Sequence, residues 1–90
     1  MLSVLSTMSA ITVLYFAGLR ELTRRTEEQL ELPAEISTVK DLIEHLGRSR
    51  PELSGRFASV RVAINESFVG PEHALHPGDV VALIPPVAGG

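Results

Sequence analysis

The residues best placed to do chemistry lie at the end of the chain, in the segment Pro85-Pro86-Val87-Ala88-Gly89-Gly90. Two adjacent prolines stiffen the exit from the preceding apolar stretch and direct the segment away from the body of the protein. Gly89 and Gly90 have no Cβ atoms, so a terminus built from them can thread a narrow channel. The pattern indicates a terminus that can enter such a channel, with the Gly90 carboxylate at its tip. The alternative is a frayed end, which terminal glycines often form.

The other reactive side chain types give little chemistry. The chain has no cysteine, which excludes disulfides, thiolate metal sites and a cysteine nucleophile, and means that sulfur cannot be carried here as a persulfide. His45, His73 and His76 show no metal-ligand spacing. We therefore expect no metal site and assign the three histidines no function.

Length and composition predict one soluble globular domain over residues 1–90. Ninety residues, of which 44% are hydrophobic and 21% charged, suffice for a single core. The formal net charge of −3 comes from acidic and basic residues that are interspersed, without a Lys/Arg stripe. Nucleic acid is therefore not expected as a partner, and a protein is.

The apolar start of the chain, residues 1–18, raises the question of export. It lacks the positive region of a secretory signal and the arginines of a transit peptide, and serines and threonines interrupt it, so neither export nor a membrane span is expected. We expect a cytoplasmic protein that does not contact the membrane. Met8 is an alternative start, with residues 1–9 a disordered extension or an upstream mis-start.

The apolar pattern of the first half predicts strand, helical turn, strand and helix. Residues 11–16 fit a strand buried on both faces, 19–25 a helical turn, and 26–32 a half-exposed strand that pairs with the first. Val39, Leu42, Ile43 and Leu46 share one helical face, which indicates a helix near residues 38–48. Thr38 and Asp41 match a variant of the capping box, and Gly47 is expected to close the helix in a left-handed turn.

The second half predicts three further strands and their turns. The expected elements are a short turn at residues 51–57, strands at 60–64 and 68–69 joined by a turn at 65–67, a type II turn at 76–79, and a central strand at 80–84 covered on both sides. One helix cannot cover both faces of a sheet. The second face is therefore either a binding surface or an exposed apolar patch.

These residues together resemble the small subunits of molybdopterin synthase, which are β-grasp (ubiquitin-like) sulfur carriers. Val13-Leu14-Tyr15-Phe16-Ala17 followed by Leu19-Arg20-Glu21-Leu22 is similar to that family's first strand and helical turn, and Asn65 sits in its hairpin turn. The closing segment from Leu75 through Gly78-Asp79 to Pro-Pro-Val-x-Gly-Gly is similar almost position by position. The resemblance implies an α+β, β-grasp fold with a mixed sheet of four to five strands on one main helix, and a protruding tail at residues 85–90.

The resemblance also implies a mechanism. A partner activating enzyme uses ATP and Mg²⁺ to adenylate the Gly90 carboxylate, and a persulfide from a donor protein then converts it to a thiocarboxylate. The tail enters the large synthase subunit and gives sulfur to cyclic pyranopterin monophosphate, so two transfers build the molybdopterin dithiolene. No cofactor is bound permanently by the small subunit, and the main catalytic groups belong to the large subunit of a heterotetramer.

Phe16, Arg20 and Ile84 are implied to contact the large subunit, Phe16 and Ile84 on the open sheet face and Arg20 beside it. Structural roles are the alternative, since Phe16 also suits a core and Arg20 a solvated helix. Three other functions stay open: a sulfur carrier of another pathway, a ubiquitin-like modifier that forms isopeptide bonds through Gly90, and a non-covalent binding module.

Overall fold

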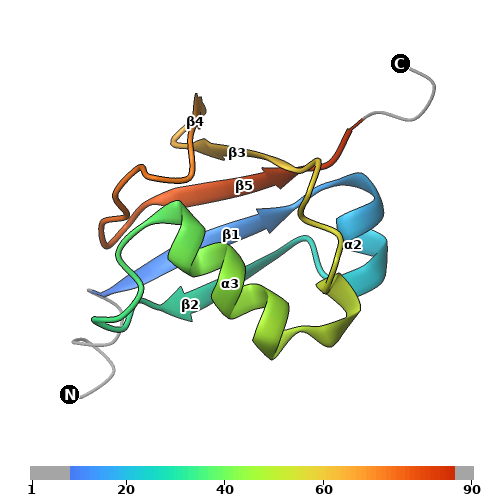
Figure 1. Ribbon diagram of the computed structural model, residues 1–90, viewed down its shortest axis with the longest axis horizontal. Helices are drawn as coiled ribbons and strands as arrows, with labels where there is room; N and C mark the ends of the chain where they lie inside the picture. The colour runs from blue at the N-terminus through green and yellow to red at the C-terminus, as the bar shows by residue number, and fades with distance from the viewer. Residues whose placement is uncertain (1–8, 87–90) are drawn as a thin grey trace.

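The computed structural model describes residues 9–86 and shows one mixed sheet with helices packed on it (Figure 1). The sheet has five strands in the order β2-β1-β5-β3-β4; β1 and β5 run parallel, and the other neighbours run antiparallel. The elements in chain order are β1 (Ala10–Tyr15), α2 (Ala17–Thr23), β2 (Glu27–Glu31), α3 (Val39–Ser49), the 3-10 helix η1 (Pro51–Leu53), β3 (Arg61–Ile64), β4 (Ser67–Val69) and β5 (Val80–Ile84). The predicted strands, turns and main helix are confirmed. The expectations for residues 1–8 and 87–90 fall outside the described part of the chain.

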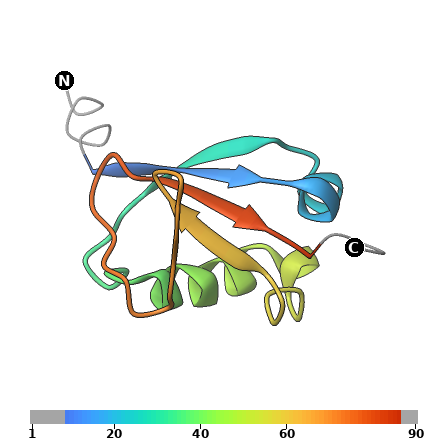
Figure 2. The ribbon, with the colours of Figure 1, turned by 90° about the horizontal axis from the view of Figure 1, so that it is seen from above.

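The core lies between α3 and one face of the sheet, as Figure 2 shows from above. Side chains of a strand alternate between its two faces, so every second residue of β1 and β5 points towards α3. The apolar stripe of α3 meets them, and the predicted helical core face is confirmed. The fully buried side chains of these three elements are Ile11, Val13, Tyr15, Leu42, Leu46, Val81 and Leu83.

The prediction that the first and last strands are covered on both faces is wrong. Thr12 and Leu14 of β1 are only half-buried, and Val80 of β5 is 37% exposed. Phe16 lies just after β1, as the residue before α2, and is 43% exposed. The reason is that α3 covers one face only, so the apolar residues at alternate positions lie on a face that no helix of the described chain covers.

Both ends of α3 lie within one residue of the predicted range 38–48, but the role predicted for Gly47 is wrong. Thr38 Oγ1 accepts a hydrogen bond from the Asp41 amide at 3.2 Å, and Asp41 Oδ2 accepts from the Thr38 amide at 3.2 Å, which completes the capping box. Backbone hydrogen bonds from Ser37 and Thr38 hold the pKa of Asp41 below its usual value. The helix continues through Gly47 to Ser49, and Arg50 ends it with φ −129°, so the left-handed freedom of Gly47 is not used.

Asn65 fixes the turn between β3 and β4 onto β5. Its side chain accepts a hydrogen bond from the Val80 amide at 3.1 Å and donates one to Asp79 at 3.0 Å. Asn65 and Glu66 both have positive φ, 51° and 75°, which matches the primed turns that suit two-residue hairpins. Gly78 has φ 89°, as the predicted type II turn requires.

A buried carboxylate joins the edge strand β2 to the end of α3. Glu28 accepts a hydrogen bond from the Tyr15 hydroxyl at 2.6 Å. It accepts two more from the Arg50 guanidinium, one of them from Nε at 2.9 Å. Arg25 Nη1 lies 3.6 Å from Glu28 Oε2. Burial raises the pKa of Tyr15 to about 12, and the hydrogen bond with Glu28 adds to the effect. Burial alone would raise the pKa of Glu28, but the bonds from Arg50 and Tyr15 and the charge of Arg50 bring it below its usual value.

We predict that Glu28→Gln lowers the free energy of unfolding by about 2 kcal/mol, because it leaves Arg50 without its carboxylate partner. Glu27→Gln, on the exposed side of the same strand, is the matched control and should change stability little. The pKa of Glu28 is lower in the folded than in the unfolded protein. Its contribution to the free energy of unfolding is therefore complete above the unfolded-state pKa of about 4.3, and it is lost as pH falls through the folded-state pKa. Urea unfolding of the variants at several pH values measures this. A difference from wild type that does not shrink in acid would contradict the assignment.

Candidate functional site

The sheet face opposite α3 carries an apolar hollow of about 620 Å³. We call this surface the open face. Its lining is Leu14, Phe16, Ala63, Asn65, Glu66, Phe68, Val80, Ala82 and Ile84.

Strand register explains why this face is hollow. Leu14 pairs with Ala82, Ala82 with Ala63, and Ala63 with Phe68, so one row of side chains crosses four strands. Two alanines lie in the middle of the row and larger side chains at its ends. The row therefore forms a shallow apolar depression, a shape that fits a convex apolar group of a partner.

Phe68 is the most exposed large apolar side chain of the described residues, at 56%. The Arg61 guanidinium stacks on its ring, with the guanidinium carbon 3.9 Å from the ring centroid. Sequence analysis placed Phe68 in a short strand without assigning it a role. The sequence does not show which of Phe68 and Val69 faces the core. In the structure Val69 packs against the core, and alternation along the strand puts Phe68 on the opposite face.

The tail leaves the sheet beside a second hollow, a groove of about 820 Å³. We call it the tail groove. Its walls are formed by α2 and the residue before it, by the loop residues Gly55, Arg56, Ala58 and Ser59, and by the segment Ile84-Pro85-Pro86. Ile84 and Pro85 are half-buried and Pro86 is exposed. The structure thus brings together all three residues predicted to contact a partner, because Phe16, Arg20 and Ile84 all line this groove.

Short-range contacts hold α2 in place beside the tail. Leu19 is buried beneath the helix, and Thr23 Oγ1 donates a hydrogen bond to the Leu19 carbonyl at 2.9 Å. Arg24 closes the helix in the left-handed conformation, with φ 59°. Arg20 lies on the outer side, exposed to solvent. The helix thus fixes the backbone of Arg20 next to the tail exit.

The described part of the site offers apolar contact surface and the positive charges of Arg20 and Arg56. Among residues 9–86, no three His, Asp or Glu side chains gather closely enough to hold a metal ion. In the same range, no helix has the length and apolar character needed to cross a membrane. The predicted reactive group, the Gly90 carboxylate, and the tail residues Val87, Ala88 and Gly89 lie beyond the described residues.

Known proteins are similar to this chain in sequence and in architecture. The sequence model of the ThiS family matches residues 13–90. The molybdopterin synthase sulfur carrier subunit of Chlamydomonas reinhardtii is 38% identical over 82 residues, covering 89% of this chain and 98% of its own. The subunit of the same name from Escherichia coli K12 is 37% identical over 82 residues, covering 89% of this chain and 99% of its own.

The fold is the ubiquitin-like β-grasp. The crystal structure of SAMP1 from Haloferax volcanii superposes with a TM-score of 0.79 at 26% identity, covering 90% of this chain and 99% of that one. The chain belongs to the ThiS family, as the family match over most of its length and its identity to the curated sulfur carrier subunits show.

We predict that truncating a side chain destabilises the protein much more on the core face of the sheet than on the open face. Leu83→Ala, in the core, should lower the free energy of unfolding by about 3 kcal/mol, whereas Phe68→Ala on the open face should lower it by less than about 1 kcal/mol. Urea unfolding followed by far-UV circular dichroism measures both. Equal losses would show that Phe68 is needed for folding and would argue against an open face kept for binding.

Proposed function

We propose that this chain is the sulfur carrier subunit of a molybdopterin synthase. The observation that carries the proposal is a match along nearly the whole chain, through Gly90, to a family whose curated members bear that name. The geometry supports it, because an apolar docking face and a proline-led tail base lie side by side and share Phe16 and Ile84.

The proposed chemistry takes place at the Gly90 carboxylate and begins on a partner enzyme. A carboxylate is a poor acceptor for sulfur, so an activating enzyme transfers AMP from Mg²⁺-bound ATP to it and releases pyrophosphate. The terminal sulfur of a donor protein's persulfide attacks the acyl-adenylate, and AMP leaves. A second thiol then cleaves the S–S bond, which leaves a thiocarboxylate on Gly90.

The thiocarboxylate then delivers its sulfur in the large subunit of the synthase. The acceptor is cyclic pyranopterin monophosphate, and two such transfers complete the molybdopterin dithiolene. This chain contributes positioning: the open face binds the large subunit, and the tail base directs Gly90 into its active site. Holding the reacting groups in place in this way supplies a large share of the rate acceleration in bimolecular reactions.

A protein-modifying role is the second candidate, because a solved neighbour, SAMP1 of Haloferax volcanii, is described as a small archaeal modifier protein. Its 26% identity is below the 37–38% shared with the carrier subunits. A modifier would form isopeptide conjugates between Gly90 and lysines of other proteins. Their presence in cells, detected as Gly90-dependent higher-mass species, would favour that role.

Thiocarboxylation can be read directly from the intact mass. Incubation of the full chain with its activating enzyme, ATP, Mg²⁺ and a sulfur donor should add about 16 Da, because sulfur replaces one oxygen of the terminal carboxylate. A chain lacking Gly90 is the control and should not gain this mass. An unchanged mass for the full chain, under conditions in which a related carrier is converted, would contradict the proposal.

Docking through the open face is tested by introducing a charge there. Phe68→Asp should weaken binding to the large subunit at least tenfold, or about 1.4 kcal/mol, because a carboxylate would be buried in an apolar contact. Ala34→Asp places the same charge on an exposed loop and should have little effect. Isothermal titration calorimetry measures both affinities. Equal affinities of the two variants would show that Phe68 lies outside the interface.

A further inference from the structure

Two arginines of the tail groove have no partner within the described chain. Arg20 on α2 and Arg56 in the loop after η1 are the charged residues among those lining the groove, and both are exposed. Across residues 9–86, no carboxylate lies within ion-pair distance of either guanidinium. Three of the other arginines are used internally, since Arg25 and Arg50 pair with Glu28 and Arg61 stacks on Phe68, whereas Arg24 and Arg48 lie outside the groove. The groove therefore presents two positive charges that the fold itself does not need.

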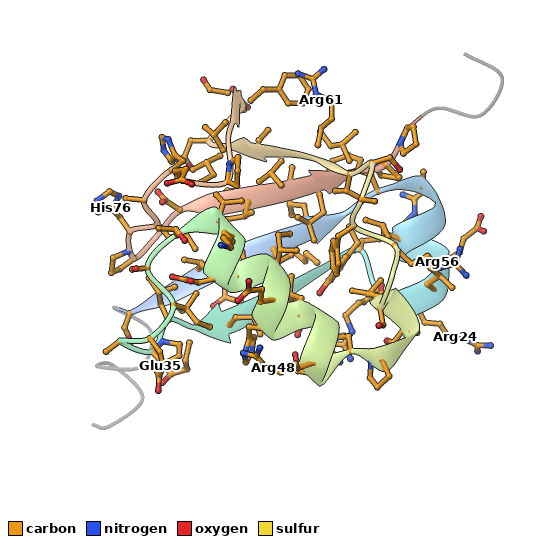
Figure 3. The ribbon with its side chains drawn as sticks, viewed as in Figure 1. Arg24, Glu35, Arg48, Arg56, Arg61 and His76 are labelled. Carbon is orange, nitrogen blue, oxygen red and sulfur yellow. The ribbon has the colours of Figure 1, made fainter. Side chains whose placement is uncertain are left out.

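The backbone that carries Arg56 is fixed. Its amide donates a hydrogen bond to the Leu53 carbonyl at 2.9 Å, and Gly55 before it adopts φ 80°, a conformation that suits glycine. Leu53 itself is fully buried. Figure 3 shows Arg56 and Arg24 at the same end of the molecule as α2, with Glu35 and His76 at the opposite end. The charge of Arg56 is thus held at the end of the molecule from which the tail leaves.

Chain length decides what must lie against this groove. Gly90 is the fourth residue after Pro86, and a fully extended chain spans at most about 14 Å over four residues. An active site that encloses the Gly90 carboxylate must therefore open close to Pro86. Since Pro86 forms part of the groove wall, the rim of that opening comes to lie over the tail groove.

We propose that Arg56, together with the Arg20 already expected at this contact, binds carboxylates on the rim of the large subunit's tail channel, so that the tail groove is a second contact surface beside the open face. This inference rests on the proposed function. The groove's other walls are largely apolar, with Phe16, Leu22 and Ile84 among them, which suits the side chains of a protein better than a small hydrated anion. Arg56 contributes to this surface although no motif or spacing singled it out.

The charges act mainly on orientation and association rate. The chain carries a net charge of −3, so an acidic surface is repelled by the protein as a whole and attracted near the two arginines of the groove. Charges at the rim of an interface chiefly change the association rate and its dependence on salt. The two arginines thereby favour encounters in which the tail faces the channel.

Charge reversal at Arg56 tests the proposal. Arg56→Glu should weaken binding of the full chain to the large subunit about tenfold at low salt, mostly through a slower association rate, and the loss should shrink at high salt. Arg48→Glu is the matched control, since Arg48 is an exposed arginine of α3 outside both surfaces, and it should change affinity less than about twofold. Surface plasmon resonance at two salt concentrations gives both rate constants. Arg56→Gln should lie between wild type and Arg56→Glu, and thermal melts monitor folding.

The outcomes separate this inference from the proposed function. If Arg56→Glu and Arg48→Glu bind alike while the wild-type chain binds and gains its sulfur, the role of Arg56 is wrong and the carrier function stands. If the wild-type chain does not bind the large subunit at all, both fail. Titration of inorganic phosphate into the free chain tests the alternative of a small-anion site. Saturable phosphate binding to the wild-type chain that is lost in Arg56→Glu would indicate such a site and overturn the proposal of protein carboxylates.

Discussion

The structure depends on one constraint: a single long helix covers one face of a five-stranded sheet. Helix α3 buries the alternate residues of β1, β3 and β5 that point towards it, and burial of this apolar surface is the main force that stabilises a domain of this size. The remaining alternate positions of these strands, such as Leu14 and Ala82, then form the open face, which contributes little to folding. That surface is free to be apolar for another purpose, namely binding.

The same arrangement gives the tail a firm base. Strand β5 lies between β1 and β3, and each of its sides is hydrogen-bonded to a neighbour. Its last residue, Ile84, leads directly into the two prolines. A central strand is harder to displace than an edge strand, so the direction in which the tail leaves is set by the whole sheet rather than by a loop. The carbonyl carbon of Gly90 can then be presented at a reproducible place on a partner.

Features encoded over a few residues could be predicted from the sequence, and features that depend on register or distant contacts could not. The capping box of Thr38 and Asp41 and the turn at Gly78 are local, and both are confirmed. Gly47 was expected to close α3, but the helix ends at Ser49 and Arg50 follows it, with a side chain that bonds to Glu28, 22 residues away. The single helix correctly implied one uncovered face of the sheet, whereas the apolar runs of β1 and β5 were wrongly interpreted as strands covered on both faces, because an apolar run does not reveal on which side helices pack.

Some residues of the candidate site could likewise be predicted from the sequence, and others could not. Phe16, Arg20 and Ile84 were identified through resemblance to a family, and the structure brings them to one groove. Phe68 and Arg56 were not identified, since the first depends on pairing with Ala63 and the second on the path of a loop. Phe16 and Ile84 line the open face as well as the tail groove, so a partner that covers one surface also meets the other. A tail that ends in two glycines has few side-chain contacts with which to select a partner. Selectivity must therefore come from the joined surfaces behind it, with apolar contact giving affinity and the arginines giving orientation.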